Sequence, residues 1–155
     1  MDLFQLNTHN CYQALTEVGA GMSRCEEVVY ALQEPYINTK KELSNIPKGY
    51  DVFPGHKGDH PRVAIFATRQ LQLVELSQFT DRYHVAVKGT IGGFETIIAS
   101  VYLHSDMDVI TTNLTKLVEY ADNKKYALII CTDSNAHSQL SVSYTHLTLP
   151  TNREV

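Results

Sequence analysis

Short apolar runs separated by polar or glycine-rich segments dominate the pattern of this chain. Such runs, bounded by turn residues, are typical of β-strands, whereas apolar positions three and four residues apart are typical of amphipathic helices. The first pattern predicts strands over residues 3–9, 27–35, 62–69, 71–76, 83–91, 94–104 and 126–135. The second pattern predicts helices over residues 11–24 and 106–122. Residues 36–61, with scattered prolines and glycines, are predicted to form a long loop.

The order of these elements favours an α/β (α+β) sandwich over a doubly wound parallel sheet. Gly92 and Gly93 lie between two β-type runs and predict a tight hairpin, so the central strands are expected to be mainly antiparallel. Polar residues recur where predicted strands end, at Asn7, Glu34, Tyr102 and Asp133. Because strand ends from distant parts of a chain can meet at one rim of a sheet, this rim is the predicted functional site.

Length and composition indicate one globular domain with a single sizeable core. The chain has 155 residues, of which 43% are hydrophobic and 19% are charged. No apolar run reaches the roughly 18–20 residues that a membrane span needs, so no membrane partner is predicted. The net charge of -4 argues against a generally basic surface, but a local basic cleft for DNA remains compatible with it.

Cysteine usage and the N-terminal segment predict a nuclear or cytoplasmic protein. The three cysteines have neither paired nor zinc-type spacing, which fits inert thiols in a reducing compartment. The first ten residues lack the basic and apolar regions of a secretory signal.

The carboxylates and amides at the predicted strand ends could support metal-dependent chemistry. Glu34 directly follows the apolar run VVYALQ, where a carboxylate is costly unless it is paired or binds a cation. Asp133 and Asn135 are two residues apart, so in an extended segment their side chains share a face. Mg²⁺ binds through one or two carboxylates, waters and substrate phosphates, which makes phosphodiester hydrolysis a candidate activity.

Each candidate residue also has a plainer interpretation. Glu34 could be a strand-end partner of an arginine or lysine, and Asp133 with Asn135 could form a turn or a helix cap. Tyr102 could be a half-buried strand aromatic, and His137 a surface residue. The order N…QEP…SVY…DSNAH, with each segment at the end of a β-type run, favours a joint site.

The chain resembles the endonuclease/exonuclease/phosphatase superfamily, and especially the endonuclease domain of jockey-like non-LTR retrotransposons. The resemblance spans residues 3–140 and rests on segments in the family's order and approximate spacing: QLN (5–7), VVYALQEPY (28–36), RVAIFA (62–67), ASVYLH (99–104) and TDSNAHS (132–138). It implies a four-layer α/β sandwich of the DNase I-like type. It also implies DNA nicking with Mg²⁺, or alternatively Mn²⁺, and a reverse transcriptase domain in the same parent polyprotein.

The resemblance further implies a role for each candidate residue. The glutamate would be a cation ligand, the tyrosine would contact the scissile phosphate, and the aspartate would act on the nucleophile or leaving group. The predicted metal-site residues are Glu34 and Asn7. The predicted catalytic residues are Asn7, Tyr102, Asp133 and Asn135. The predicted substrate-binding residues are Tyr102, Asn135 and His137.

The C-terminal part of the chain departs from the family. Residues 1–140 are predicted to be the N-terminal part of the domain, because the late aspartate-histidine pair of the family has no counterpart here. This chain is therefore expected to be inactive by itself and to expose an apolar sheet edge. Residues 141–155 are predicted to be non-native read-through, since VSYTHLTLPT (142–151) is what a transposase-based sequencing adapter encodes.

Two alternatives to a retrotransposon nuclease remain open at this stage. The first is another phosphoesterase of the same superfamily, either an abasic-site nuclease or a phosphoinositide phosphatase. The second is a non-catalytic module that binds nucleic acid or protein through the same rim. Metal binding through Glu34 would separate the enzymes from the non-catalytic module.

Overall fold

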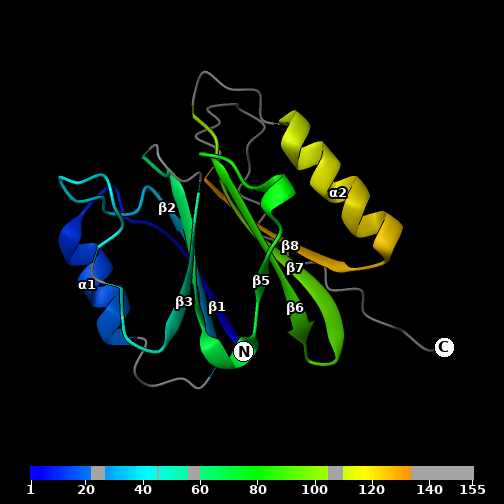
Figure 1. The fold of residues 1–155 in the computed structure, drawn as a ribbon, viewed down its shortest axis with the longest axis horizontal. Helices are drawn as coiled ribbons and strands as arrows, with labels where there is room; N and C mark the ends of the chain where they lie inside the picture. The colour runs from blue at the N-terminus through cyan, green and yellow to red at the C-terminus, as the bar shows by residue number, and fades with distance from the viewer. Residues whose placement is uncertain (22–26, 45, 56–59, 105–109, 134–155) are drawn as a thin grey trace, which may run out of the picture.

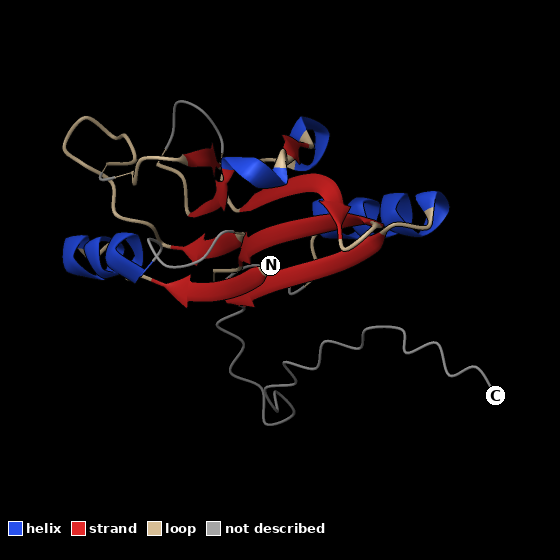
Figure 2. Ribbon diagram, turned by 90° about the horizontal axis from the view of Figure 1, so that it is seen from below, coloured by secondary structure: helices blue, strands red, loops and turns tan. Residues whose placement is uncertain are grey.

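The computed structural model describes residues 1–21, 27–44, 46–55, 60–104 and 110–133, and these form two stacked sheets between two α-helices (Figure 1 and Figure 2). The first sheet has the order β1-β2-β4-β3, from Asp2–Asn7, Val28–Gln33, Val63–Thr68 and Tyr50–Pro54. The second has the order β5-β6-β7-β8, from Val74–Glu75, His84–Ile91, Phe94–Tyr102 and Ala127–Asp133. The α-helices are α1 (Tyr12–Gly21) and α2 (Thr112–Lys124), and the short 3-10 helices are η2 (Arg69–Leu71) and η3 (Ser77–Phe79).

Three apolar layers hold these elements together and confirm the predicted four-layer α/β sandwich. Between the two sheets lie side chains such as Ile65 of β4 and Ile98 of β7, both almost fully buried. Leu15 of α1 packs on the outer face of the first sheet together with Phe66. Leu117 of α2 packs in the same way on the outer face of the second sheet. Burying a large aliphatic or aromatic side chain contributes about 1.5–3 kcal/mol, so the layers are held mainly by these contacts.

The predicted hairpin and the last helix are confirmed, although α2 begins at Thr112 and Ile110, predicted inside the helix, precedes it. Gly92 and Gly93 have φ values of 58° and 85°, and a two-residue turn with positive φ at both positions matches the twist of the flanking strands. The side chain of Thr111 caps α2 by accepting the backbone N–H of Leu114, and Lys125 in the left-handed region ends the helix. None of the helices in the described part of the chain is long and apolar enough to cross a membrane.

Two predictions about the middle of the chain are wrong. The segment predicted as a loop contains β3 (Tyr50–Pro54), an edge strand that gains its order by antiparallel pairing with β4. The segment 71–76, predicted as a strand, has ladder pairing only at Val74–Glu75. Its buried leucines join two different layers instead of alternating along a ladder: Leu71 and Leu73 pack between the sheets, and Leu76 packs in the layer beneath α2. In both cases tertiary pairing overrides the local pattern.

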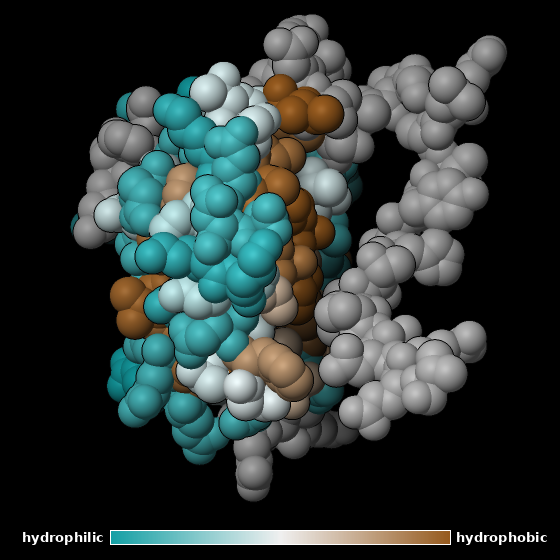
Figure 3. All heavy atoms as spheres, turned by 90° about the vertical axis from the view of Figure 1, so that its right-hand side faces the viewer, coloured by the Kyte–Doolittle hydropathy of each residue, from teal (hydrophilic) through white to brown (hydrophobic). Residues whose placement is uncertain are grey.

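Strands β1 and β8 lie at one end of their respective sheets and carry exposed apolar side chains. Phe4 and Leu6 of β1 are 46% and 37% exposed, and Ile130 of β8 is 36% exposed. Figure 3 shows an apolar band on the face seen from the right-hand side of Figure 1. Edge strands with exposed apolar side chains favour association between molecules.

This surface leads to the expectation that the purified chain self-associates. We expect its weight-average mass in sedimentation velocity to rise with concentration, and Ile130→Thr to reduce that rise. The matched control is Val118→Thr, at an exposed apolar position on α2 and not on a sheet edge, which should behave like the unmodified chain. A strictly monomeric chain with a sharp cooperative melt would contradict this expectation.

Candidate functional site

Four of the predicted site residues meet at one rim of the sandwich, which is called the rim below: Asn7, Glu34, Tyr102 and Asp133. β1 runs parallel to β2, and the last pair in their register is Asn7 with Gln33. β7 runs parallel to β8, and their last pair is Tyr102 with Asp133. Because parallel strands end on the same side, each sheet delivers two strand ends to this rim.

The side-chain amide of Asn7 joins the two carboxylates of the rim. Its Nδ2 atom donates to Oε2 of Glu34 at 3.1 Å and to Oδ2 of Asp133 at 2.5 Å. Its Oδ1 atom accepts the backbone N–H of His9 at 2.8 Å, which fixes the orientation of the amide. An amide NH₂ has two hydrogens, so it can serve one carboxylate with each. The first and last strands therefore bring Asn7 and Asp133 into contact, which is necessary if both residues belong to one site.

Glu34 has a left-handed backbone conformation, with φ at 47°. Three hydrogen bonds hold it there: its N–H donates to the carbonyl of Arg62, and its carbonyl accepts from Thr8 Oγ1 and from the N–H of Asn10. His9 and Asn10 are also left-handed, with φ values of 47° and 55°. Such conformations cost about 1–3 kcal/mol each in non-glycine residues and cluster at functional sites.

Two side chains that the sequence did not indicate, the guanidinium of Arg62 and the imidazole of His9, lie against Glu34. Nη1 of Arg62 is 3.4 Å from Oε1, and Nδ1 of His9 is 3.5 Å from Oε2. The Glu34 side chain is 20% exposed, which leaves its carboxylate accessible from the rim. The plainer interpretation of Glu34, a carboxylate paired with arginine, is thus present in the structure together with the shared site. In the sequence, these two residues could have been noticed only by their positions next to predicted strand ends: His9 is two residues after Asn7, and Arg62 begins the run RVAIFA.

Tyr102 is nearly buried and its hydroxyl is hydrogen bonded to Glu34. Burial raises the pKa of this hydroxyl, and the negative charge of Glu34 and the hydrogen bond to it raise the pKa further. The group therefore stays protonated at neutral pH and can donate a hydrogen bond. Its ring lies 6.0 Å from the guanidinium carbon of Arg62.

A buried polar bridge beneath the rim connects the two sheets. Nε2 of Gln33 donates to Oγ of Ser100 at 2.9 Å and to the carbonyl of Cys131 at 3.3 Å. Ser100 in turn donates to the carbonyl of Leu32 at 2.9 Å. Within the described residues, Oε1 of Gln33 is a buried atom without a hydrogen-bond partner. Burial also raises the pKa of the Cys131 thiol to about 11, which agrees with the predicted inert thiol.

The donor set of the rim fits a hard divalent cation. The carboxylates of Glu34 and Asp133 lie together on Nδ2 of Asn7, and carboxylate oxygens are donors that Mg²⁺ and Mn²⁺ prefer. Oδ1 of Asn7 accepts the N–H of His9, so the amide would have to turn to offer this oxygen to a cation. Among the described residues, no three or more His, Cys, Asp and Glu side chains are grouped to hold a metal ion. Mg²⁺ usually takes one or two carboxylates with waters and substrate phosphates, so a pair is sufficient.

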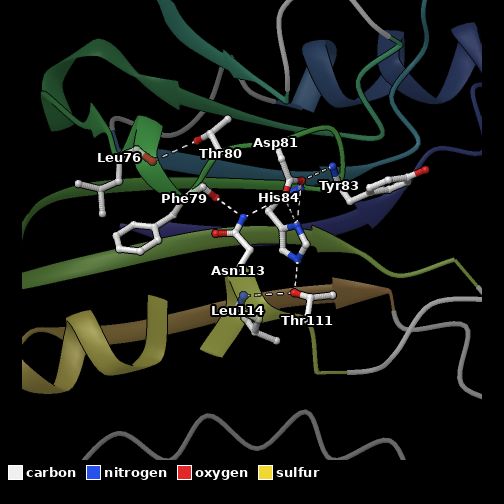
Figure 4. A network of polar contacts seen from close by, with 9 residues as sticks. All are labelled: Leu76, Phe79, Thr80, Asp81, Tyr83, His84, Thr111, Asn113 and Leu114. Carbon is white, nitrogen blue, oxygen red and sulfur yellow. Dashed lines mark hydrogen bonds and ion pairs between the residues drawn. The ribbon is translucent and has the colours of Figure 1, made fainter. Parts of the chain in front are cut away.

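A second polar cluster, called the Asp81 cluster below, connects the loop before β6 to the start of α2 (Figure 4). Nδ1 of His84 lies 2.9 Å from Oδ1 of Asp81, and Nε2 lies 2.9 Å from Oγ1 of Thr111. Nδ2 of Asn113 donates to Oδ2 of Asp81 at 3.0 Å and to the carbonyl of Phe79. His84 is buried, whereas the Asp81 side chain is 41% exposed and Thr111 and Asn113 are half-buried, so the cluster lies at the edge of the packed interior.

The Asp81 cluster should make stability depend on pH in acid. Burial alone would raise the pKa of Asp81, but hydrogen bonds from His84, from the N–H of Tyr83 and from Asn113, with the charge of His84, together lower it. Because the folded pKa lies below the unfolded value of about 3.9, the stabilisation is present above that pH and is lost as the pH falls through the folded pKa.

We expect the free energy of unfolding, measured by urea titration, to fall less between pH 7 and pH 3 in Asp81→Asn than in the unmodified chain. The control is Asp122→Asn, at a carboxylate with 78% exposure in a surface ion pair, which should keep the full pH dependence. Equal pH dependence in all three proteins would contradict this.

Comparison with known proteins gives one structural relative of interest. The sequence matches no protein-family model, and no curated protein matches it. Among solved structures, the endonuclease domain of TRAS1, a telomere-specific non-LTR retrotransposon, matches with a TM-score of 0.60 and 22% sequence identity. The match covers 86% of this chain and 58% of that structure, so the chain spans less than two thirds of its relative. At this identity the similarity shows the fold.

The fold of a retrotransposon endonuclease domain is the one predicted from the sequence. Within it, Asn7, Glu34, Tyr102 and Asp133 are brought together as described above. Asn135 and His137, and the predicted boundary between residues 1–140 and 141–155, lie outside the described residues. The chemical roles of all six residues stay predictions.

Proposed function

We propose that this chain forms part of a divalent-cation-dependent endonuclease site that nicks DNA by phosphodiester hydrolysis. One observation carries the proposal: the Asn7 amide donates to the carboxylates of both Glu34 and Asp133, which come from different sheets. Carboxylates that are partly buried close together are costly unless they are paired or bind a cation. The fold of the endonuclease domain of TRAS1 supports the same class of activity.

In this proposal Glu34 and Asn7 hold Mg²⁺, with Mn²⁺ as the alternative cation. When bound, the cation would stabilise negative charge on the phosphoryl group and favour ionisation of an attacking water. Without a cation, Asn7 keeps the two carboxylates in place, because its amide is itself held by the N–H of His9; as a ligand it would turn Oδ1 towards the cation. The left-handed conformation of Glu34 aims its carboxylate at the rim.

The remaining rim residues would act on the phosphodiester. Tyr102 would turn its single hydroxyl proton from Glu34 to a phosphoryl oxygen, and its raised pKa keeps that proton in place at neutral pH. Asp133 takes a proton from the attacking water or assists the leaving oxygen. Arg62 adds positive charge beside Tyr102. Asn135 and His137 are proposed to contact the substrate, as the sequence predicts.

We further propose a target in chromosomal DNA and a reverse transcriptase domain in the same parent polyprotein, acting in the nucleus or cytoplasm. These partners follow from the sequence resemblance, and the likeness to the TRAS1 endonuclease domain supports them. The other phosphoesterases of the superfamily are disfavoured by the QEPY and DSNAHS segments.

The test is titration of the purified chain with Mn²⁺ and with Mg²⁺, followed by a plasmid-nicking assay. We expect saturable cation binding and little or no nicking by the chain alone, as predicted from its sequence. A chain that binds neither cation is a non-catalytic module, and the proposal fails. Strong nicking that is lost in Glu34→Gln would support the nuclease activity and contradict the predicted inactivity of the chain.

A further inference from the structure

The carboxylate of Asp81 fixes the turn formed by residues 81–84. Its Oδ1 atom accepts the backbone N–H of Tyr83 at 2.7 Å and the backbone N–H of His84 at 2.9 Å. The N–H of Asp81 donates to the carbonyl of His84 at 2.8 Å, which closes the turn. An aspartate that accepts the amides two and three residues ahead stabilises a turn in this way.

Two consecutive carbonyls of this turn hold residues of the candidate site. The carbonyl of Arg82 accepts the N–H of Arg62 at 2.9 Å, and the carbonyl of Arg62 accepts the N–H of Glu34 at 2.8 Å. The carbonyl of Tyr83 accepts the N–H of Tyr102 at 2.9 Å. One turn therefore sets the backbone of residues that reach the rim from both sheets.

We propose that Asp81 is a positioning residue for the candidate site. It acts through the carbonyls of Arg82 and Tyr83, which hold Arg62 and Tyr102 at the distances needed to face Glu34. The expected effect on DNA binding rests on the proposed function. The positioning of Arg62 and Tyr102 does not, because it is made by backbone hydrogen bonds. The effect on the site comes from Oδ1, because that oxygen receives both turn amides.

The other half of the same cluster offers a separable control. Asn113 donates to Oδ2 of Asp81 and to the carbonyl of Phe79, so it links α2 to the loop. Asn113→Ala removes this link and leaves both turn amides bonded to Oδ1. Asp81→Ala removes both the bond from Asn113 and the bonds from the turn amides. Asp81→Asn retains an Oδ1 atom that can accept the turn amides.

The experiment measures Mn²⁺-dependent binding of a short DNA duplex to the full 155-residue chain by fluorescence anisotropy, with urea titration of every variant. We expect Asp81→Ala to weaken binding by about tenfold, within the range that small misplacements of binding groups cost. Asp81→Asn should restore most of the affinity, and Asn113→Ala should bind like the unmodified chain although it is less stable. Unchanged affinity in folded Asp81→Ala, or equal losses in Asp81→Ala and Asn113→Ala, would overturn the inference.

A second measurement keeps the inference distinct from the proposed function. Amide hydrogen exchange, followed by NMR, should become faster in Asp81→Ala at Arg62, Glu34 and Tyr102, while amides in the centre of the sheets stay protected. If the unmodified chain binds no DNA, the proposed function fails and the exchange data alone decide. Unchanged exchange at all three amides would then refute the positioning role.

Discussion

Replacing Glu34 by glutamine is expected to weaken Mn²⁺ binding by at least about 100-fold, since even losing a partner of a metal ligand typically costs 10–100-fold. Glutamine has nearly the same shape, and its amide oxygen can still accept from Asn7, so the fold should be retained. It loses the negative charge that attracts the cation and that pairs with Arg62. Isothermal titration calorimetry with Mn²⁺, together with circular dichroism, measures both consequences.

The control for this experiment is Glu95→Gln. Glu95 is also within 3.4 Å of a cationic side chain, that of Lys88, but it lies on β7 near the hairpin, far along the strand from Tyr102. Its replacement should leave Mn²⁺ affinity unchanged. If Glu34→Gln kept its Mn²⁺ affinity, Glu34 would be only a structural partner of Arg62 and not a cation ligand. Equal losses in both variants would show that the cation binds by general surface charge.

Truncating Ile65 to alanine is expected to have the largest effect on stability. Ile65 is fully buried in β4, at the centre of the apolar layer between the two sheets. Its removal loses apolar contact and leaves a cavity that two stacked sheets cannot easily close, which costs about 2–5 kcal/mol. Domains of this size are stable by about 5–15 kcal/mol, so a large fraction of the stability would be lost.

The matched control is Ile110→Ala. Ile110 precedes α2 and is 73% exposed, so the same change of side chain should alter the free energy of unfolding by no more than about 0.5 kcal/mol. Urea titration of both variants, monitored by circular dichroism, gives the comparison. Similar losses in the two variants would mean that the layer between the sheets is not the main source of stability.

Most elements were predictable because their signals are local. The apolar runs of β6 and β7 and the paired glycines between them are contained in adjacent residues. The buried run of β2 reads as a strand for the same reason. β3 was missed because a strand with proline at its end has a weak pattern, and its order comes from β4, which follows it in the chain.

The candidate site was predictable in part. The position of polar residues at strand ends, with the family resemblance, pointed to Asn7, Glu34, Tyr102 and Asp133. Nothing local pointed to Arg62 as a partner of Glu34, because the two are brought together by the pairing of β2 with β4. Asp81 was missed for a similar reason: its role depends on which backbone groups the turn meets in the folded chain.

The sequence by itself determined most of the elements, the hairpin and the residue types available at each strand end, because periodicity and turn chemistry act between neighbouring residues. The tertiary structure decided which strand ends meet. Asn7 and Asp133 are 126 positions apart, and only the stacking of two sheets brings the amide of one to the carboxylate of the other. Parallel pairing at both sheet edges then puts Glu34 and Tyr102 at the same rim, since parallel strands end on the same side.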